Sequence, residues 1–460
     1  MNQERTPTLT HALITLLVMA IVIIVGIRLQ SGLEGVFLPL TLAVGIVGAL
    51  HFYLRKPWAA LQENIFAGVS KVGIAVLILL LIGALVGIWI QAGVIPSLIY
   101  YGLQVISPSF FLPTTFVVCL IVSTATGTSF GTIATVGVAL MGVQAGLGIP
   151  APITAGAILS GAYFGDKMSP LSDTTNIAAA VGEADLFRHI RSMMYTTIPA
   201  ALLTFFLFWI FGSTANSMAD NQLSPMLVGL HQGWKIHFIH FIPIAIMLVM
   251  ALRRMPTLLL LFVHVVFGAI WAVIFQKASF IQVFVTATSG CKCETGVQNI
   301  DRVLSRGGMA SMEAVIILIL IAGALGGALK AAGVLEVLVN RMLRRVKRTG
   351  SLIALVLVSC YTVIIFTGNQ VLSLILVGQM FLPAFKKHRI DTTVLTRSLE
   401  DSGTISAPLV PWGVAGGFFS QLLGIPTVEY LPYCWFAFLV PVFSLLWGYT
   451  GIAVWKEKVD

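Results

Sequence analysis

The chain has 460 residues, of which 58% are hydrophobic and only 10% are charged. Soluble domains carry roughly 25% charged residues, so this composition cannot cover an aqueous surface and predicts an integral membrane protein. The net charge of +9 comes from short basic clusters at the ends of apolar runs. That pattern orients a protein in a lipid bilayer and does not indicate nucleic-acid binding.

Several continuous apolar runs are long enough to cross a bilayer, which takes about 20 helical residues. We interpret the first run as a membrane helix rather than a signal peptide, because no small-residue cleavage site closes it. The predicted spans are 9–29, 33–54, 71–99, 193–212, 235–252, 256–275, 313–339 and 432–453. Two further stretches, 107–188 and 349–430, are apolar but interrupted by Gly, Pro, Ser, Thr and acidic residues. We expect broken or re-entrant segments there.

The distribution of Lys and Arg predicts how the spans are oriented. The positive-inside rule assigns the basic clusters to the cytoplasmic side of a bacterial inner membrane, together with both termini. The main clusters are 55–56, 188–191, 253–254, 341–348, 386–389 and 456–458. The span 71–99 then runs outward, and the span 313–339 runs inward.

Short motifs recur in the same order in the two halves of the chain, which indicates an internal repeat. The pairs are Gly83-Ala84-Leu85-Val86-Gly87 with Gly323-Ala324-Leu325-Gly326-Gly327, Ala92-Gly93-Val94 with Ala332-Gly333-Val334, Thr126-Gly127-Thr128 with Thr367-Gly368-Asn369, and Pro170-Leu171 with Pro408-Leu409. The charge pattern places the two copies in opposite orientations. Glycine-lined helix packing would explain the glycines but not the acidic residues nearby.

The predicted fold is therefore an all-α polytopic membrane protein. It consists of two inverted-topology repeats with broken helices and re-entrant hairpins, and about twelve spans. The first repeat covers 1–212, an external connecting loop covers 213–234, and the second repeat covers 235–460. In such folds the binding site lies near the middle of the membrane, where broken segments of the two halves meet.

The first broken segment places many polar groups inside an apolar run. An ionised side chain there is costly unless it is paired, hydrated or bound to an ion. Pro170 interrupts the helix and frees backbone carbonyls, which add to the side-chain oxygens. The result is a hard, oxygen-rich site suited to a small cation such as Na⁺. The polar residues are Asp166, Lys167, Ser169, Ser172, Asp173, Thr174, Thr175 and Asn176.

Asp173 is our candidate for the carboxylate that exchanges its ion, and we expect Na⁺ to bind at Asp173 and Asn176. Burial favours the protonated form of a carboxyl group, whereas a bound cation favours the ionised form. A proton and Na⁺ therefore compete for one oxygen cluster, which is the minimal form of antiport. Asp166 and Lys167 are adjacent, and a structural ion pair between them is the simpler alternative.

The second broken segment carries two acids, Glu400 and Asp401, followed by Ser402. These acids either bind a second cation or pair with Arg397, and the sequence does not separate the two cases. The motifs at Thr126, Thr128 and Ser129, and at Thr367 and Asn369, have the composition of hairpin tips that contact an ion or substrate. Their hydroxyl groups could instead hydrogen-bond within a helix.

The long run 165–179, the Tyr195-Thr196-Thr197-Ile198-Pro199 motif and the run 399–404 resemble the signature of the NhaC-type Na⁺/H⁺ antiporters. The resemblance covers essentially the whole chain. It implies a bacterial secondary transporter of the broad ion-transporter class, with two inverted repeats, re-entrant hairpins and a homodimeric assembly. Relatives of this family also exchange organic acids, as in malate/lactate antiport.

We therefore expect an antiporter that exports cytoplasmic Na⁺, or Li⁺, in exchange for protons by alternating access, with no cofactor. The alternative is a Na⁺-coupled exchanger of organic anions or another small metabolite, in which Lys167 or Arg397 contacts a carboxylate. A channel fits less well, because asymmetric broken segments do not supply rings of like groups. An enzyme fits least, since no nucleophile with a base and no metal-ligand spacing is present.

Overall fold

The computed structural model describes residues 5–30, 33–213, 220–253, 255–343 and 348–456. Within those ranges the chain is helical, and its only strand-type contact is an isolated bridge between Ile390 and Lys456. Nine helices among the described residues are long and apolar enough to cross a membrane, or up to eleven if two bent pairs each form one span. The predicted all-α polytopic fold with broken helices is confirmed. The total of about twelve spans stays a prediction.

The helices of the first half are α1 (Leu9–Leu29), α2 (Phe37–Tyr53), α3 (Trp58–Lys71), α4 (Gly73–Gln91), α5 (Val94–Val105), α6 (Phe111–Thr126), α7 (Ser129–Thr132), α8 (Val138–Leu147), α9 (Ala151–Met168), α10 (Asp173–Val181) and α11 (Leu186–Ser213). Those that follow are α12 (Asp220–Gly233), α13 (Ile242–Leu252), α14 (Thr257–Gln276), α15 (Phe280–Ser289), α16 (Gln298–Leu304), α17 (Glu313–Ala332), α18 (Val334–Leu343), α19 (Thr349–Thr367), α20 (Gln370–Lys387), α21 (Thr392–Leu399), α22 (Val414–Leu423), α23 (Thr427–Tyr430) and α24 (Trp435–Thr450). The predicted connecting loop 213–234 includes residues 214–219, which lie outside the described residues, as do parts of the basic clusters at 254, 344–347 and 457–460.

Several predicted spans have other ends in the structure, and two of them end at equivalent turns. The predicted span 71–99 is part of a longer apolar helix over Trp58–Gln91, which has 34 residues and a length of about 51 Å. That helix ends where Gly93 adopts a left-handed backbone with φ of 78°. The predicted span 313–339 ends in the same way, at Gly333 with φ of 75°. Each turn falls on the same Ala-Gly-Val motif of the sequence repeat, where glycine adopts this conformation without steric cost.

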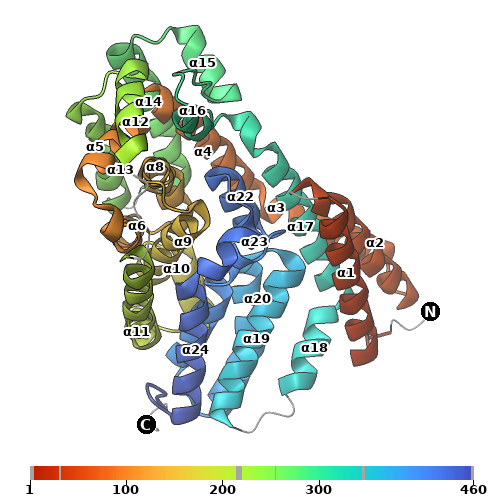
Figure 1. Ribbon diagram of the computed structural model, residues 1–460. Helices are drawn as coiled ribbons and strands as arrows, with labels where there is room; N and C mark the ends of the chain where they lie inside the picture. Colours follow the sequence, from red (N-terminus) through yellow and green to blue (C-terminus); the bar gives the residue numbers. More distant parts are fainter. Residues whose placement is uncertain (1–4, 31–32, 214–219, 254, 344–347, 457–460) are drawn as a thin grey trace.

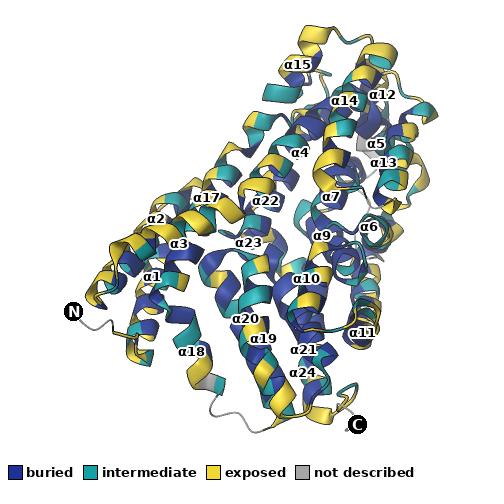
Figure 2. Ribbon diagram, turned by 180° about the vertical axis from the view of Figure 1, so that it is seen from behind, coloured by how far each residue is buried: buried dark blue, intermediate teal, exposed yellow. Residues whose placement is uncertain are grey.

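The helices form an elongated molecule whose sides differ in composition. Figure 1 shows α1, α2, α3 and α17 grouped on one side and α12, α14, α15 and α16 at one end, with α11, α19 and α24 running toward the opposite end. Large apolar side chains remain exposed along outer faces, and Figure 2 shows such exposed positions on α2 and α11. Examples are Leu13, Leu17, Ile21, Leu38, Leu42, Leu202, Ile210, Phe262 and Ile274. A continuous apolar exterior of this kind fits a lipid surround rather than water.

Glycines set how closely α9 packs on α6. A Cβ atom at Gly165 would lie 2.2 Å from the backbone nitrogen of Thr124, and one at Gly161 would lie 2.3 Å from the carbonyl oxygen of Phe116. Small residues four apart on one helix let two backbones approach directly, as in membrane helix pairs. This contact fixes the end of α9, and therefore the polar segment that follows it, in the interior of the protein.

Candidate functional site

The break after α9 is produced by Pro170, because proline lacks a backbone N–H and disfavours helical geometry in the residue before it. The hydroxyl group of Thr175 donates to the carbonyl oxygens of Lys167 at 2.9 Å and Asp166 at 3.2 Å. These contacts satisfy backbone oxygens that the interrupted helix would leave free. Ser169 Oγ accepts a hydrogen bond from the amide two residues later. Side chains of the segment thus stabilise its own irregular backbone.

The carboxylate of Asp166 is the centre of a cluster of oxygen atoms. Ser129 Oγ donates to Asp166 Oδ2 at 2.5 Å, and Ser172 Oγ donates to Asp166 Oδ1 at 2.6 Å. The hydroxyl of Thr174 lies 3.1 Å from that of Ser172. The side chain of Asp166 is buried, and the whole residue is only 5% exposed. Hard oxygen donors of this kind are the ligands that small cations prefer.

Asp173 and Asn176, where we expected Na⁺, lie at the edge of this cluster. Both residues are exposed, and Asp173 begins α10. The Asn176 side-chain amide donates to the carbonyl oxygens of Ser172 at 2.7 Å and Pro170 at 3.0 Å. Asn176 therefore ties α10 to the broken segment. The role of Asp173 as the exchanging carboxylate stays a prediction.

Lys167 forms an ion pair with Asp401 rather than with its neighbour Asp166. Lys167 Nζ lies 2.7 Å from Asp401 Oδ1, and both side chains are completely buried. Thr197 Oγ1 accepts a hydrogen bond from Lys167 Nζ at 2.6 Å, and Thr196 Oγ1 donates to Asp401 Oδ1 at 2.9 Å. The pair joins the two broken segments of the chain. The two threonines of α11 hold it in position from one side.

Arg397, which we considered as a partner of the second pair of acids, contacts the C-terminal segment instead. Its Nη1 atom donates to the carbonyl oxygen of Ala453 at 2.9 Å, and its guanidinium lies over the ring of Trp455 at 5.9 Å. Arg397 is fully buried and forms no salt bridge with any acid that the structure describes. Its Nε and Nη2 atoms have no hydrogen-bond partner among those residues.

Glu400 lies in a π-helical turn over 400–404 that directly follows α21. The residue is completely buried, and neither carboxylate oxygen has a hydrogen-bond partner among the described residues. Lys167 and Asp166 lie near enough to interact with it electrostatically. Ser402 Oγ, in the same turn, donates to the carbonyl oxygen of Ser398 at 2.8 Å. Single π turns inside helices often occur at functional sites.

Left-handed glycines make the two predicted hairpin tips. Gly127, after α6, has φ of 72°, and Gly368, after α19, has φ of 65°. The next residue caps the following helix in each case: Thr128 Oγ1 accepts from the backbone nitrogen of Gly131 at 3.3 Å, and Asn369 Oδ1 accepts from Leu372 at 3.0 Å. These two tips are therefore equivalent in backbone form as well as in sequence.

The other predicted tip residues divide between structural and site roles. Thr367 Oγ1 donates to the carbonyl oxygen of Val363 at 2.7 Å, which is the hydrogen bond within a helix that we held as the alternative. Thr126 Oγ1 lies 3.4 Å from Thr132 Oγ1 and contacts its own helix. Ser129 alone among these hydroxyls reaches an acid, Asp166.

Three residues near the cluster, Thr196, Thr197 and Tyr163, were not among the site residues that the sequence pattern predicts. The two threonines are adjacent hydroxyl residues in an otherwise apolar span, and Thr197 lies two positions before Pro199. This pattern could have identified them as candidate site residues. Tyr163 lies one helical turn before Asp166, and its hydroxyl has no hydrogen-bond partner within the described part of the chain.

Comparison with known proteins gives consistent family matches. The model of the Na⁺/H⁺ antiporter family matches residues 6–162 and 161–452. A protein of Alkalihalophilus pseudofirmus named Na⁺/H⁺ antiporter NhaC is 38% identical, covering 99% of this chain and 98% of that protein. A Bacillus subtilis protein named malate-2H⁺/Na⁺-lactate antiporter is 36% identical, covering 100% of this chain and 98% of the relative. The Halobacterium salinarum arginine/ornithine antiporter ArcD is 33% identical, covering 99% and 94%.

Among solved structures, the chain is similar to Neisseria gonorrhoeae MtrF, described as one of a class of antimetabolite efflux pumps. The sequences are 12% identical, the TM-score is 0.40, and the match covers 84% of this chain and 83% of that one.

Proposed function

The chain belongs to the Na⁺/H⁺ antiporter family, and from this premise we propose that it is a secondary transporter that exports cytoplasmic Na⁺ in exchange for external protons by alternating access. Similarity over nearly the full length to relatives named Na⁺/H⁺ antiporters supports the exchanged ions. The inverted orientation of the two repeats is part of the same proposal. The pairing of left-handed glycines at Gly93 and Gly333 and at Gly127 and Gly368 supports the repeat itself. The distribution of Lys and Arg supports the opposite orientation of its two copies.

The observation that carries the proposal is an excess of acids over bases in the buried cluster. Lys167 neutralises Asp401, whereas Asp166 and Glu400 form no salt bridge with any described residue. A buried carboxylate without a cationic partner is costly, so each of these acids needs either a proton or a bound cation. A carboxylate that can bind either H⁺ or Na⁺, but not both at once, couples the movement of Na⁺ to the movement of H⁺.

We assign the ion-exchanging role to Asp166, and its burial and ligand set support this choice over Asp173. With Na⁺ bound, the lone pairs of Ser129, Ser172 and Thr174 would join the carboxylate around the cation. With Na⁺ absent, the carboxyl takes a proton; its O–H would then donate to one of the two serine hydroxyls, while the other serine hydroxyl still donates to the carboxyl group. Asp173, exposed at the start of α10, would be the first acid that an ion meets.

Glu400 is proposed as a second proton site beside the ion pair. Neither of its carboxylate oxygens accepts a hydrogen bond from the part of the chain that the structure describes, so no such contact stabilises the ionised form there. While Lys167 remains paired with Asp401, a protonated and therefore neutral Glu400 avoids the cost of a buried charge without a counter-ion. A cation that enters the cluster can displace the proton from Glu400, or it can compete with Lys167 for the carboxylate of Asp401.

The test is a pH-sensitive dye assay in inverted membrane vesicles from a host without its own antiporters. Vesicles energised with a proton gradient receive NaCl, LiCl or KCl in separate runs. We expect proton efflux with NaCl and LiCl but not with KCl. A Glu429→Gln variant, which changes an exposed acid of α23 outside the cluster, is the matched control and should respond like the wild type. No response to NaCl at normal expression would contradict Na⁺/H⁺ antiport.

Exchange of an organic anion is the second candidate. The buried guanidinium of Arg397 favours it, because its Nε and Nη2 have no hydrogen-bond partner among the described residues. Lys167, in contrast, already forms an ion pair with Asp401. The same vesicle assay separates the two candidates. Proton flux that requires malate or lactate in addition to Na⁺ would move the protein to this class.

A further inference from the structure

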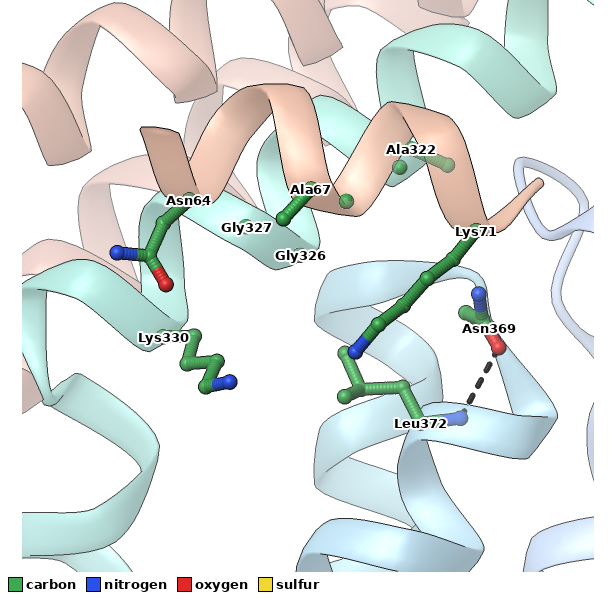
Figure 3. A pocket seen from close by; sticks show the side chains of 11 residues that line it. Asn64, Ala67, Lys71, Ala322, Gly326, Gly327, Lys330, Asn369 and Leu372 are labelled. Carbon is green, nitrogen blue, oxygen red and sulfur yellow. Dashed lines mark hydrogen bonds between the residues drawn. The ribbon is translucent and has the colours of Figure 1, made fainter. Parts of the chain in front are cut away.

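A cleft separate from the acidic cluster lies between α3 and α17 on one side and the start of α20 on the other. The polar residues that line it are Asn64 and Lys71 of α3, Lys330 of α17, and Asn369 at the tip of the second hairpin. Figure 3 shows the side chains of Lys71 and Lys330 extending into the same space beneath α3. Ala67 and Leu372 add apolar surface to its walls.

Glycines bring the two lysines into one cleft. A Cβ atom at Gly68 would lie 2.2 Å from the carbonyl oxygen of Gly323, and one at Gly327 would lie 2.1 Å from that of Asn64. The backbones of α3 and α17 therefore touch, which only glycine permits at these positions. Since the helices are this close, Lys71 and Lys330 reach the cleft from opposite sides, although they are distant in sequence.

The charge in this cleft is positive, and none of the described residues that line it is an acid. Neither lysine forms a salt bridge with an acid in the described ranges. Glu336 of α18 lies within electrostatic range of Lys330 but does not pair with it. In addition, α20 begins at its cap Asn369, so the positive end of that helix dipole faces the same space.

We propose that this cleft binds a small organic anion with two carboxylate groups. Each ammonium group can neutralise one carboxylate, and the ligand would remove the repulsion between the two lysines. The Asn369 side-chain oxygen is occupied as a helix cap, which leaves its NH₂ group free to donate to a carboxylate. The apolar contribution of Ala67 and Leu372 fits a short carbon chain better than an inorganic ion.

The site is placed so that its occupancy can influence the acidic cluster. Five residues after Asn369, Leu374 of α20 packs against the π turn that contains Glu400, since a Cβ atom at Gly403 would lie 2.7 Å from Leu374 Cδ2. An anion that fixes the start of α20 would therefore bias the position of that turn. This coupling depends on the proposed antiport, but binding to the cleft does not.

The experiment measures equilibrium binding of radiolabelled succinate to the full-length protein in phosphatidylcholine nanodiscs, without an ion gradient. Variants Lys71→Gln and Lys330→Gln should each lower the affinity about tenfold, and the double variant further, because each removes one charge-assisted contact. Lys386→Gln, an exposed lysine that pairs with Glu183 elsewhere, is the matched control and should bind like the wild type.

Double-variant affinity within twofold of the wild type, or no saturable succinate binding by the wild type, would overturn the proposal. Inorganic phosphate and phosphatidylglycerol nanodiscs serve as competing probes. If inorganic phosphate displaces radiolabelled succinate as effectively as unlabelled succinate does, the proposed preference for a dicarboxylate is wrong. If phosphatidylglycerol abolishes succinate binding in a lysine-dependent way, the cleft is a lipid-headgroup site and the organic-acid proposal fails. Because no transport is measured, neither result bears on Na⁺/H⁺ antiport.

Discussion

Lys167 and Asp401 form a fully buried ion pair, with 2.7 Å between Nζ and Oδ1, that connects the broken segment of the first half to that of the second. Among the described residues, Lys167 is the lysine that pairs with an acid of the cluster, so Asp166 and Glu400 need a proton or another cation as counter-charge. Two threonines of α11 hold the pair in place: Thr197 accepts a hydrogen bond from Lys167, and Thr196 donates one to Asp401.

Replacing one member of this ion pair should destabilise the protein more than replacing both members. Lys167→Met or Asp401→Asn alone leaves an uncompensated buried group, and we expect a loss of about 3–5 kcal/mol in the free energy of unfolding. The double variant Lys167→Met/Asp401→Leu should recover a large part of that loss, because both charges are absent. Melting temperatures of the purified variants in one detergent are the measurement. A double variant that melts no higher than the weaker single variant would contradict a direct interaction.

The choice between Asp166 and Asp173 can be tested by comparing their amide variants. We expect Asp166→Asn to abolish Na⁺-dependent proton flux in inverted vesicles, because Asn cannot carry the exchanged proton. Asp173→Asn should retain flux, with a higher half-saturating Na⁺ concentration. If instead Asp173→Asn abolishes flux and Asp166→Asn retains it at equal expression, the exchanging carboxylate is Asp173, as its position in the motif predicts.

The hydroxyl groups on Asp166 provide a finer test of the ion site. Ser129→Ala and Ser172→Ala each remove one hydrogen bond to the carboxylate, and we expect a rise of about tenfold in half-saturating Na⁺. Thr362→Ala is the matched control, because its hydroxyl donates to the carbonyl oxygen of Val358 within α19, away from the cluster. Equal effects of all three substitutions would argue against Na⁺ binding at Asp166.

Glu400→Gln should leave the protein at least as stable as the wild type. The amide keeps the volume of the side chain but carries no charge into a site where neither carboxylate oxygen of Glu400 has a hydrogen-bond partner within the described ranges. If Glu400 is a second proton site, the variant should also lose one proton from the number exchanged per Na⁺. Proton and ²²Na⁺ fluxes measured on the same proteoliposomes give that ratio. An unchanged ratio with full stability would restrict Glu400 to a packing role.

The sequence predicted those features that depend on local chemistry. Composition and apolar runs indicated the membrane-spanning helices, and the Pro and Gly motifs located the breaks at Pro170, Gly127 and Gly368. Pairing between distant segments could not be derived, because Lys167 is adjacent to Asp166 in sequence yet contacts Asp401 in space. Burial likewise depends on packing, so the sequence favoured Asp173, whereas the structure buries Asp166 and leaves Asp173 exposed at the start of α10.

The contact between α6 and α9 offers the clearest test of how the site is positioned. Gly165→Ala would place a Cβ atom 2.2 Å from the backbone nitrogen of Thr124, which no side-chain rearrangement can relieve. We expect a lower melting temperature and loss of Na⁺-dependent flux, because α9 must move and carries Asp166 and Lys167 with it. Gly45→Ala in α2 is the matched control: nothing lies within 4 Å of its Cβ position. Since alanine is the better helix former, that variant should gain up to about 1 kcal/mol and transport normally. Wild-type flux in Gly165→Ala would mean that the site tolerates displacement of α9, and that the close glycine contact does not position it.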